Sequence, residues 1–369
     1  MKEKERREYS LDILKILATI MIVFHHYQQG EGVSFSHFNF YGGKFYFGWL
    51  VELFFILSGY FMFRYVEKIR NGLSFRRFFL KRYLRVLPIM FLSAIGHQII
   101  KCWYQKATTG SVEHDLFSLW KTVISAFGIQ RGWVFQNKLD INNPAWYISV
   151  LLACYLYFFF VTYLSGRTRT SPWIWYGGLV LVGIWAYLNK PSLPLLNQYT
   201  GRGIQSFFWG LILAKGIGLL REKGARGLWC GIYVWVFLAL VAIPVLIYRE
   251  SAFVSDNVNY LMIFICYPAL MILFTSGFMK KLFSARWIGS LAAISFNVYI
   301  WHVCGRLLMD ILIAWDILIV DVKSPVTMIV YTLCMFVIGT GSYYLIEKPV
   351  ANALSKAGIC QEVQNGPES

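Results

Sequence analysis

The sequence predicts an all-α membrane protein with about ten transmembrane helices and both termini in the cytoplasm. Of the 369 residues, 57% are hydrophobic and only 15% are charged, which gives more apolar surface than a soluble domain of this size can bury. Aromatic residues make up 18%, as expected where tryptophan and tyrosine gather at both membrane interfaces. Apolar stretches long enough to cross a bilayer recur along the whole chain.

Ten apolar segments follow one another, separated by mostly short loops. They cover residues 11–28, 47–65, 84–101, 145–164, 173–189, 203–220, 228–248, 258–279, 287–305 and 325–346. The long loop 102–144 contains one amphipathic piece that we expect to lie on the membrane surface. We expect residues 1–355 to form one transmembrane domain and residues 356–369 to form a polar tail.

Lysine and arginine residues set the predicted orientation. With the N-terminus inside, twice as many of them fall in the inner loops and ends as in the outer ones, in agreement with the positive-inside rule. The net charge of +16 is thus concentrated on one face of the membrane, where it suits anionic lipids or an anionic ligand. Nucleic acid is therefore not an expected partner. The seven cysteines form no CxxC pair, and we expect neither a disulfide framework nor a metal site.

The first segment, LDILKILATIMIVFHHYQ, carries ionisable residues inside a predicted span. Lys15 and His26 are eleven positions apart, so they differ by only about 20° around a helix, and Asp12 lies on the same side. Ionisable groups inside a membrane are costly and therefore indicate function. We expect Asp12 to pair with Lys15 and fix its rotamer. The alternative is an interfacial pair that merely ends the helix, with two histidines at its outer mouth.

His25 lies about 100° away from this polar side of the helix. If the facing argument holds, its replacement by alanine should retain activity, whereas replacement of His26 should not. The two adjacent histidines therefore provide a test of the assignment.

A basic loop lies between the second and third segments. Its sequence SFRRFFLKRYLRVLP contains the candidate phosphate-binding residues Arg76, Arg77, Lys81, Arg82 and Arg85. Guanidinium forks suit phosphate, and Arg82 and Arg85 are spaced to share a helical face. The alternative is a cluster that only sets topology and binds lipid.

Polar residues also recur at a depth that the topology places in the outer half of the membrane. They are His26, Glu52, His97, Trp146, Arg202, Asn297 and His302. Each has a structural explanation as a belt, snorkelling or packing residue, but together they predict a polar cavity that opens outwards around a histidine base. We expect Glu52 to orient His26 or the substrate. The expected substrate-binding residues are Trp146, Arg202, Asn297 and His302.

Several stretches of the chain resemble the acyltransferase 3 family, integral-membrane enzymes that acylate sugars and other cell-surface molecules. They are YSLDILKILATIMIVFHH, VELFFILSGYF, the RxxR of Arg82 and Arg85, PAWYISVLLACYL, GRGIQSFFWG, IGSLAAISFNVYIWHV and YYLIEKPV, in the family's order. The first family motif has a basic residue, ten intervening positions and a histidine, which correspond here to Lys15 and His26. Two departures are Lys15 in place of the usual arginine and AWYISVLL without the glutamate of the WSLSVE-type signature.

The resemblance implies an acyl-coenzyme A cosubstrate, with acetyl-CoA expected, on the cytoplasmic side of a bacterial inner membrane. It implies transfer to a hydroxyl of a glycan or lipid-linked glycan, with His26 as the catalytic histidine. Lys15 or Arg202 would offset the negative charge that develops during attack, and a covalent acyl-histidine relay is a variant of this mechanism. The alternative function is a transporter or flippase that uses the same polar cavity without acyl transfer and needs the basic loop only for topology.

Overall fold

The computed structural model describes residues 7–36, 39–112, 116–133, 141–223, 226–249 and 252–356. Within these ranges the chain is almost entirely helical, as predicted. In chain order the elements are α1 (Tyr9–Glu31), η1 (Phe47–Trp49), α2 (Leu50–Met62), η2 (Phe63–Tyr65), α3 (Val66–Arg70), α4 (Phe75–Thr109), α5 (Leu116–Ala126), η3 (Asn143–Ala145), α6 (Trp146–Arg167), α7 (Pro172–Asn189), β1 (Ser192–Leu193), β2 (Leu196–Asn197), α8 (Gln198–Lys223), α9 (Arg226–Tyr248), α10 (Ala252–Leu261), η4 (Met262–Cys266), α11 (Tyr267–Phe274), α12 (Gly277–Leu282), α13 (Arg286–Ala314), α14 (Pro325–Ser342), η5 (Tyr343–Glu347) and α15 (Lys348–Lys356). The two short strands pair antiparallel, with Ser192 opposite Asn197 and Leu193 opposite Leu196. Beyond Lys356 the predicted polar tail lies outside the described residues.

Nine helical stretches of the described ranges are long and apolar enough to cross a membrane. They coincide with nine of the ten predicted segments. The remaining segment forms α7, which is not among the nine and packs along α8. The protein is therefore a multi-pass, all-α membrane protein.

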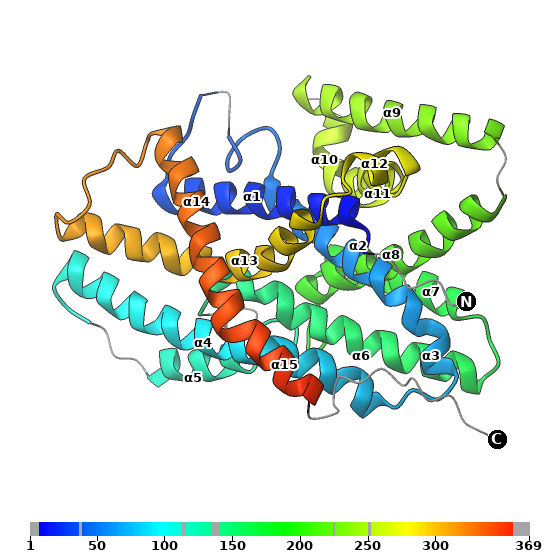
Figure 1. Cartoon of the computed structure of the whole chain (residues 1–369), viewed down its shortest axis with the longest axis horizontal. Coiled ribbons are helices and arrows are strands. Elements are labelled where there is room, and N and C mark those ends of the chain that lie inside the picture. Colours follow the sequence, from blue (N-terminus) through cyan, green and yellow to red (C-terminus); the bar gives the residue numbers. More distant parts are fainter. Residues whose placement is uncertain are drawn as a thin grey trace.

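Helix α13 brings together segments that are far apart in the sequence. It packs against α1, α4 and α14, and α1 also contacts α14 (Figure 1). Residues of the first helix thus lie beside residues of the last third of the chain. This arrangement brings side chains of α13 into separate polar contacts with α1, with α4 and with η5.

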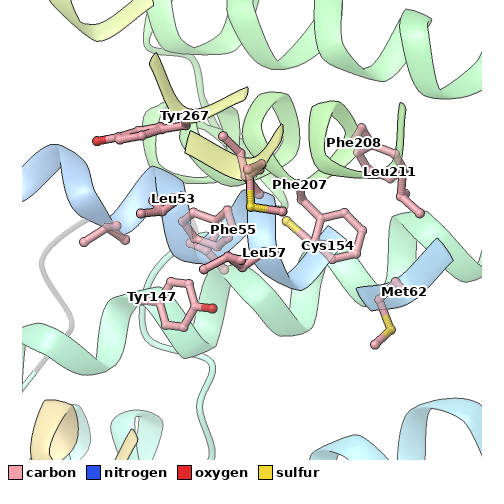
Figure 2. Packing of buried hydrophobic residues seen from close by; sticks show 14 of the residues in the cluster. Leu53, Phe55, Leu57, Met62, Tyr147, Cys154, Phe207, Phe208, Leu211 and Tyr267 are labelled. Atoms are coloured by element: carbon pink, nitrogen blue, oxygen red, sulfur yellow. The ribbon is translucent and has the colours of Figure 1, made fainter. Parts of the chain in front are cut away.

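Helices α2 and α8 cross so closely that their backbones touch. A Cβ atom on Gly59 would overlap the carbonyl oxygen of Phe207, and one on Gly210 would overlap the carbonyl oxygen of Ile56. Small residues allow such close approach between membrane helices. Figure 2 shows side chains of α2, α6 and α8 packed together around Phe55, Cys154 and Phe207.

We expect Gly210→Ala to destabilise the protein by about 1–3 kcal/mol, because the added methyl group must push the two backbones apart. On the same helix, a Cβ on Gly216 would meet no atom within 4 Å. Gly216→Ala should therefore be neutral or stabilising by up to about 1 kcal/mol, since it only improves helix propensity. Melting temperatures of the two variants in one detergent test this difference, and equal melting would contradict the close crossing.

The basic segment that the sequence predicts as a loop is helical. Helix α4 begins at Phe75, directly after Ser74, whose Oγ accepts a hydrogen bond from the Arg77 amide at 3.4 Å. All five candidate phosphate-binding residues lie in the first three turns of this helix. The amphipathic piece predicted in the long loop forms α5, which packs against α4.

Candidate functional site

A charged cluster lies at the N-terminal end of α1. Asp12 is buried, and its carboxylate accepts hydrogen bonds from Arg7 Nε at 2.6 Å and from Lys15 Nζ at 3.0 Å. Arg7 also donates from Nη2 to the carbonyl oxygen of Gly289 at 2.6 Å. The predicted Asp12–Lys15 pair is thus present, and Arg7 connects it to α13.

Lys15 lines a cavity of about 240 Å³ between α1, α2, α6 and α13. A dry cavity of about 150 Å³ holds a benzene-sized group, so this one has room for a slender chain of atoms. Most of its wall is apolar or aromatic. The polar exceptions include Ser58 and Tyr147, whose hydroxyl oxygens lie 3.0 Å apart and share a hydrogen bond. Tyr155 and Tyr299 also line it.

His26 meets His302 of α13 near the C-terminal end of α1. The centroids of the two imidazole rings lie 5.1 Å apart. His26 Nδ1 lies 3.0 Å from Gln29 Oε1, and His302 Nδ1 lies 2.7 Å from the carbonyl oxygen of Tyr299. Because both of these oxygens can only accept, each Nδ1 carries a hydrogen, and in the neutral ring each Nε2 has a lone pair. Two basic nitrogens are therefore presented by neighbouring rings.

His25 has a hydrogen-bond partner and packing partners of its own, although its ring also contacts that of His26, with the two centroids 5.1 Å apart. It is buried, its Nδ1 lies 2.8 Å from the carbonyl oxygen of Phe40, and its ring packs against Tyr41 and Tyr46. This histidine thus holds the segment after α1. Alanine at this position would lose that hydrogen bond and packing. We therefore expect His25→Ala to retain the catalytic chemistry but to lower the stability of the protein.

Glu52 is fully buried and forms a bidentate ion pair with Arg202. Arg202 Nε lies 2.6 Å from Glu52 Oε1, and Arg202 Nη2 lies 3.0 Å from Glu52 Oε2. The guanidinium carbon lies 4.8 Å from the ring centroid of Trp146. Three predicted site residues therefore meet, but Glu52 has a partner other than His26. The Arg202 charge is already balanced by this carboxylate.

Asn297 belongs to a third polar cluster. Its Nδ2 donates to Glu347 Oε2 at 2.7 Å, and Glu347 Oε1 also accepts from Arg85 Nη2 at 3.1 Å. Asn297 and His302 are five residues apart on α13, so they point about 140° away from each other. The predicted polar residues thus form separate groups of contacts in the described part of the chain, and His97 pairs with Cys304 at 3.4 Å from Nδ1 to Sγ.

Arg82 turns inward from the start of α4. Its guanidinium carbon lies 3.8 Å and 4.2 Å from the ring centroids of Phe78 and Tyr65. It also lies 5.6 Å from the ring centroid of Tyr155, which lines the cavity. A cation therefore stands beside the cavity at this point.

The other candidate phosphate-binding residues lie on a more open surface. Arg85 pairs with Glu347, yet its side chain is 65% exposed. Arg76 and Arg77 are exposed, and Lys81 is half-buried. Basic groups are thus present both on the surface of α4 and, through Arg82, next to the cavity.

Arg306 is a charged residue near the histidines that sequence reasoning missed. Its Nη1 lies 3.1 Å from Glu31 Oε1 and 2.8 Å from Asp310 Oδ2. Its side chain packs against Gly30, one helical turn beyond His26, where a Cβ atom would overlap it. The sequence did contain a signal for this residue. Arg306 and Asp310 are four residues apart inside an apolar stretch, and this spacing places two side chains together on a helix.

Tyr299 connects the cavity to the histidine pair. Its side chain lines the cavity, its ring centroid lies 5.9 Å from that of His302, and its carbonyl oxygen holds His302 Nδ1. Its hydroxyl donates to the carbonyl oxygen of Pro144 at 2.8 Å. Tyr299 is therefore the single residue that separates the cavity beside Lys15 from the two histidines, His26 and His302.

Comparison with known proteins gives one match. A family model described as an acyltransferase domain matches residues 8–347. No curated protein and no solved structure matches the chain at a significant level. The matched region runs from the start of α1 to the end of η5, so it contains the cavity, the two histidines and the basic start of α4.

Proposed function

Since the chain belongs to the acyltransferase 3 family and is a membrane acyltransferase, we propose that it moves an acyl group from cytoplasmic acyl-coenzyme A to a hydroxyl of a cell-surface glycan or lipid-linked glycan. The expected acyl group is acetyl, and the expected location is a bacterial inner membrane. His26 acts as the general base.

The observation that carries this proposal is the cavity between Lys15 and Tyr299, with the histidine pair next to its wall. Its volume of about 240 Å³ suits a slender acyl-bearing arm and not a whole nucleotide cosubstrate. The bulky, phosphorylated end of coenzyme A must then remain outside the cavity. This division supports a donor that enters from the basic side of the protein.

Basic residues at the start of α4 support the donor assignment. Arg82 lies beside the cavity wall at Tyr155, while Arg85 is mostly exposed and can offer its guanidinium to an anion. Arginine binds phosphate through two parallel hydrogen bonds. Phosphates held here would leave the acyl-bearing arm free to reach the cavity.

The chemistry needs a base because an alcohol is a weak nucleophile at neutral pH. Histidine has an ordinary pKa close to neutrality, and His26 Nε2 has the free lone pair. It removes the hydroxyl proton while the oxygen attacks the thioester carbon. The carbon–sulfur bond breaks, and the leaving coenzyme A thiolate receives the proton from the imidazolium. The Lys15 ammonium and the hydroxyls of Ser58 and Tyr147 supply polar contacts for the bound arm.

Binding of acetyl-CoA to the purified protein tests the donor. We expect saturable binding that weakens at least about tenfold in Arg82→Lys or Arg85→Ala, because each change removes charged hydrogen bonds worth about 1.5–3 kcal/mol. Arg167→Ala is the matched control, since Arg167 is an exposed arginine at the end of α6, hydrogen-bonded to Tyr163. Isothermal titration of each folded variant gives the dissociation constants. No binding to folded wild-type protein would favour the transporter instead.

A further inference from the structure

His302 has a buried nitrogen without a partner. Its side chain is only 1% exposed, and its Nε2 has no hydrogen-bond partner among the described residues. Its other nitrogen is committed to the carbonyl oxygen of Tyr299, so Nε2 can only accept. A buried acceptor left unpaired costs about 1–3 kcal/mol, and a hydroxyl donor from outside the chain would recover this cost.

The neighbouring His26 is only half-buried, and its Nε2 also has a lone pair in the neutral ring. The two ring centroids are 5.1 Å apart, and Gln29 fixes the hydrogen of His26 on Nδ1. In the described part of the chain no third histidine, cysteine or carboxylate joins them to complete a metal site. The two adjacent rings therefore offer two acceptor nitrogens for two hydroxyl hydrogens.

We propose that the acceptor substrate is a vicinal diol, such as adjacent hydroxyls of a sugar ring, with one hydroxyl bound to His26 and its neighbour bound to His302. This inference rests on the proposed function and narrows its acceptor class. Adjacent ring carbons present both hydroxyls on one edge. Each ring would then accept one hydroxyl hydrogen bond of the usual length, about 2.8 Å. His302 is then a specificity-determining residue.

The two hydroxyls have different fates. The hydroxyl at His26 loses its proton to Nε2, forms the new bond to the acyl carbon, and the thiolate leaves as described above. The hydroxyl at His302 keeps its hydrogen and remains bound throughout. A substrate without this second hydroxyl leaves His302 Nε2 unpaired again. Buried polar sites reject an analogue most strongly when it leaves one of their polar groups unpaired.

Chemical modification of His26 tests the diol site without any acyl donor. Diethylpyrocarbonate reacts with the lone-pair nitrogen of imidazole, and mass spectrometry of the purified protein measures the rate for each histidine. We compare protection by cis-cyclohexane-1,2-diol with protection by cyclohexanol at the same concentration. The diol should slow modification of His26 several-fold more than cyclohexanol does. His97 of α4 serves as the internal reference, because its Nδ1 contacts Cys304 Sγ and its ring is not part of the histidine pair.

Two variants connect the effect to His302. His302→Leu removes the second acceptor and should abolish the difference between the two probes. His302→Gln supplies an amide oxygen in its place and should keep part of the difference. In both variants, modification of His26 without any probe reports that the site remains folded and reachable.

The proposal is overturned if the two probes protect equally, if neither protects, or if the difference survives in His302→Leu. Equal or absent protection would mean that a bridging water only satisfies His302. Because the assay contains no coenzyme A, its result is independent of the donor. Diol protection in a protein that fails to bind acetyl-CoA would remove the proposed function and keep the diol site, whereas the reverse result would remove only the diol site.

Discussion

Replacement of His26 by asparagine is expected to lower the rate of acyl transfer by about 10²- to 10⁴-fold, the usual contribution of a general base. Asparagine retains an amide group close to the position of Nδ1, which bonds Gln29. It has no lone-pair nitrogen that can take a proton. The rate is measured as transfer of labelled acetyl from acetyl-CoA to the glycan fraction of membranes that contain equal amounts of each variant.

His25→Asn is the matched control, since it makes the same change one residue away. The asparagine amide can donate to the carbonyl oxygen of Phe40 in place of Nδ1, so the segment after α1 keeps its anchor. We expect this variant to retain most of the transfer rate. The opposite pattern, with His25→Asn inactive and His26→Asn active, would show that the two roles are assigned the wrong way round.

Contacts within one helix follow from the sequence because helical spacing fixes them. Asp12 and Lys15 are three residues apart and form the predicted ion pair. The spacing also separates His25 from His26, and the structure gives their Nδ1 atoms different partners, although the two rings contact each other. The same reasoning fails for Arg82 and Arg85, because their long side chains turn towards Tyr65 and Glu347 respectively.

Contacts between helices depend on which faces meet, and no single segment specifies this. Depth in the membrane could be predicted from topology, and it grouped Glu52, Asn297 and His302 together. Rotation about each helix axis then sends them to three different neighbours: Arg202, Glu347 and His26. The contact between His26 and His302 joins the first helix to a helix in the last third of the chain, so it requires the packing of α1 on α13.

The start of α4 shows a second limit of hydropathy. The apolar stretch begins near residue 84, but the helix begins at Phe75 because a helix requires hydrogen bonding and not apolar side chains. Charged residues therefore continue the helix beyond the apolar stretch. Glu347 was missed for a related reason: it stands in the quoted YYLIEKPV stretch, yet only the structure shows that it binds Asn297 and Arg85.

Removal of the Glu52 charge should be the most destabilising single change among the polar clusters. In Glu52→Gln the Arg202 guanidinium remains buried, since its side chain is only 17% exposed, and it has lost its bidentate partner. Breaking a buried ion pair in this way costs about 3–5 kcal/mol. The free energy of unfolding, measured by denaturing-detergent titration in mixed micelles, tests the value.

Glu67→Gln is the matched control for this prediction. Glu67 pairs with Arg70 at 3.6 Å, but its side chain is 71% exposed, so the loss should stay below about 1 kcal/mol. Similar losses in both variants would mean that water reaches Glu52 and screens the charge of Arg202.

The double variant Glu52→Leu/Arg202→Met separates stability from chemistry. It removes both charges at once, and such replacements are commonly neutral or stabilising. We expect its stability to return to the wild-type value and its acyl transfer to persist, because the Arg202 guanidinium is occupied by Glu52 and is not free to meet the reacting groups. Restored stability with lost transfer would instead place Arg202 at the acceptor, as the sequence alone predicts. That result would make Glu52 the group that holds a substrate-binding cation in position.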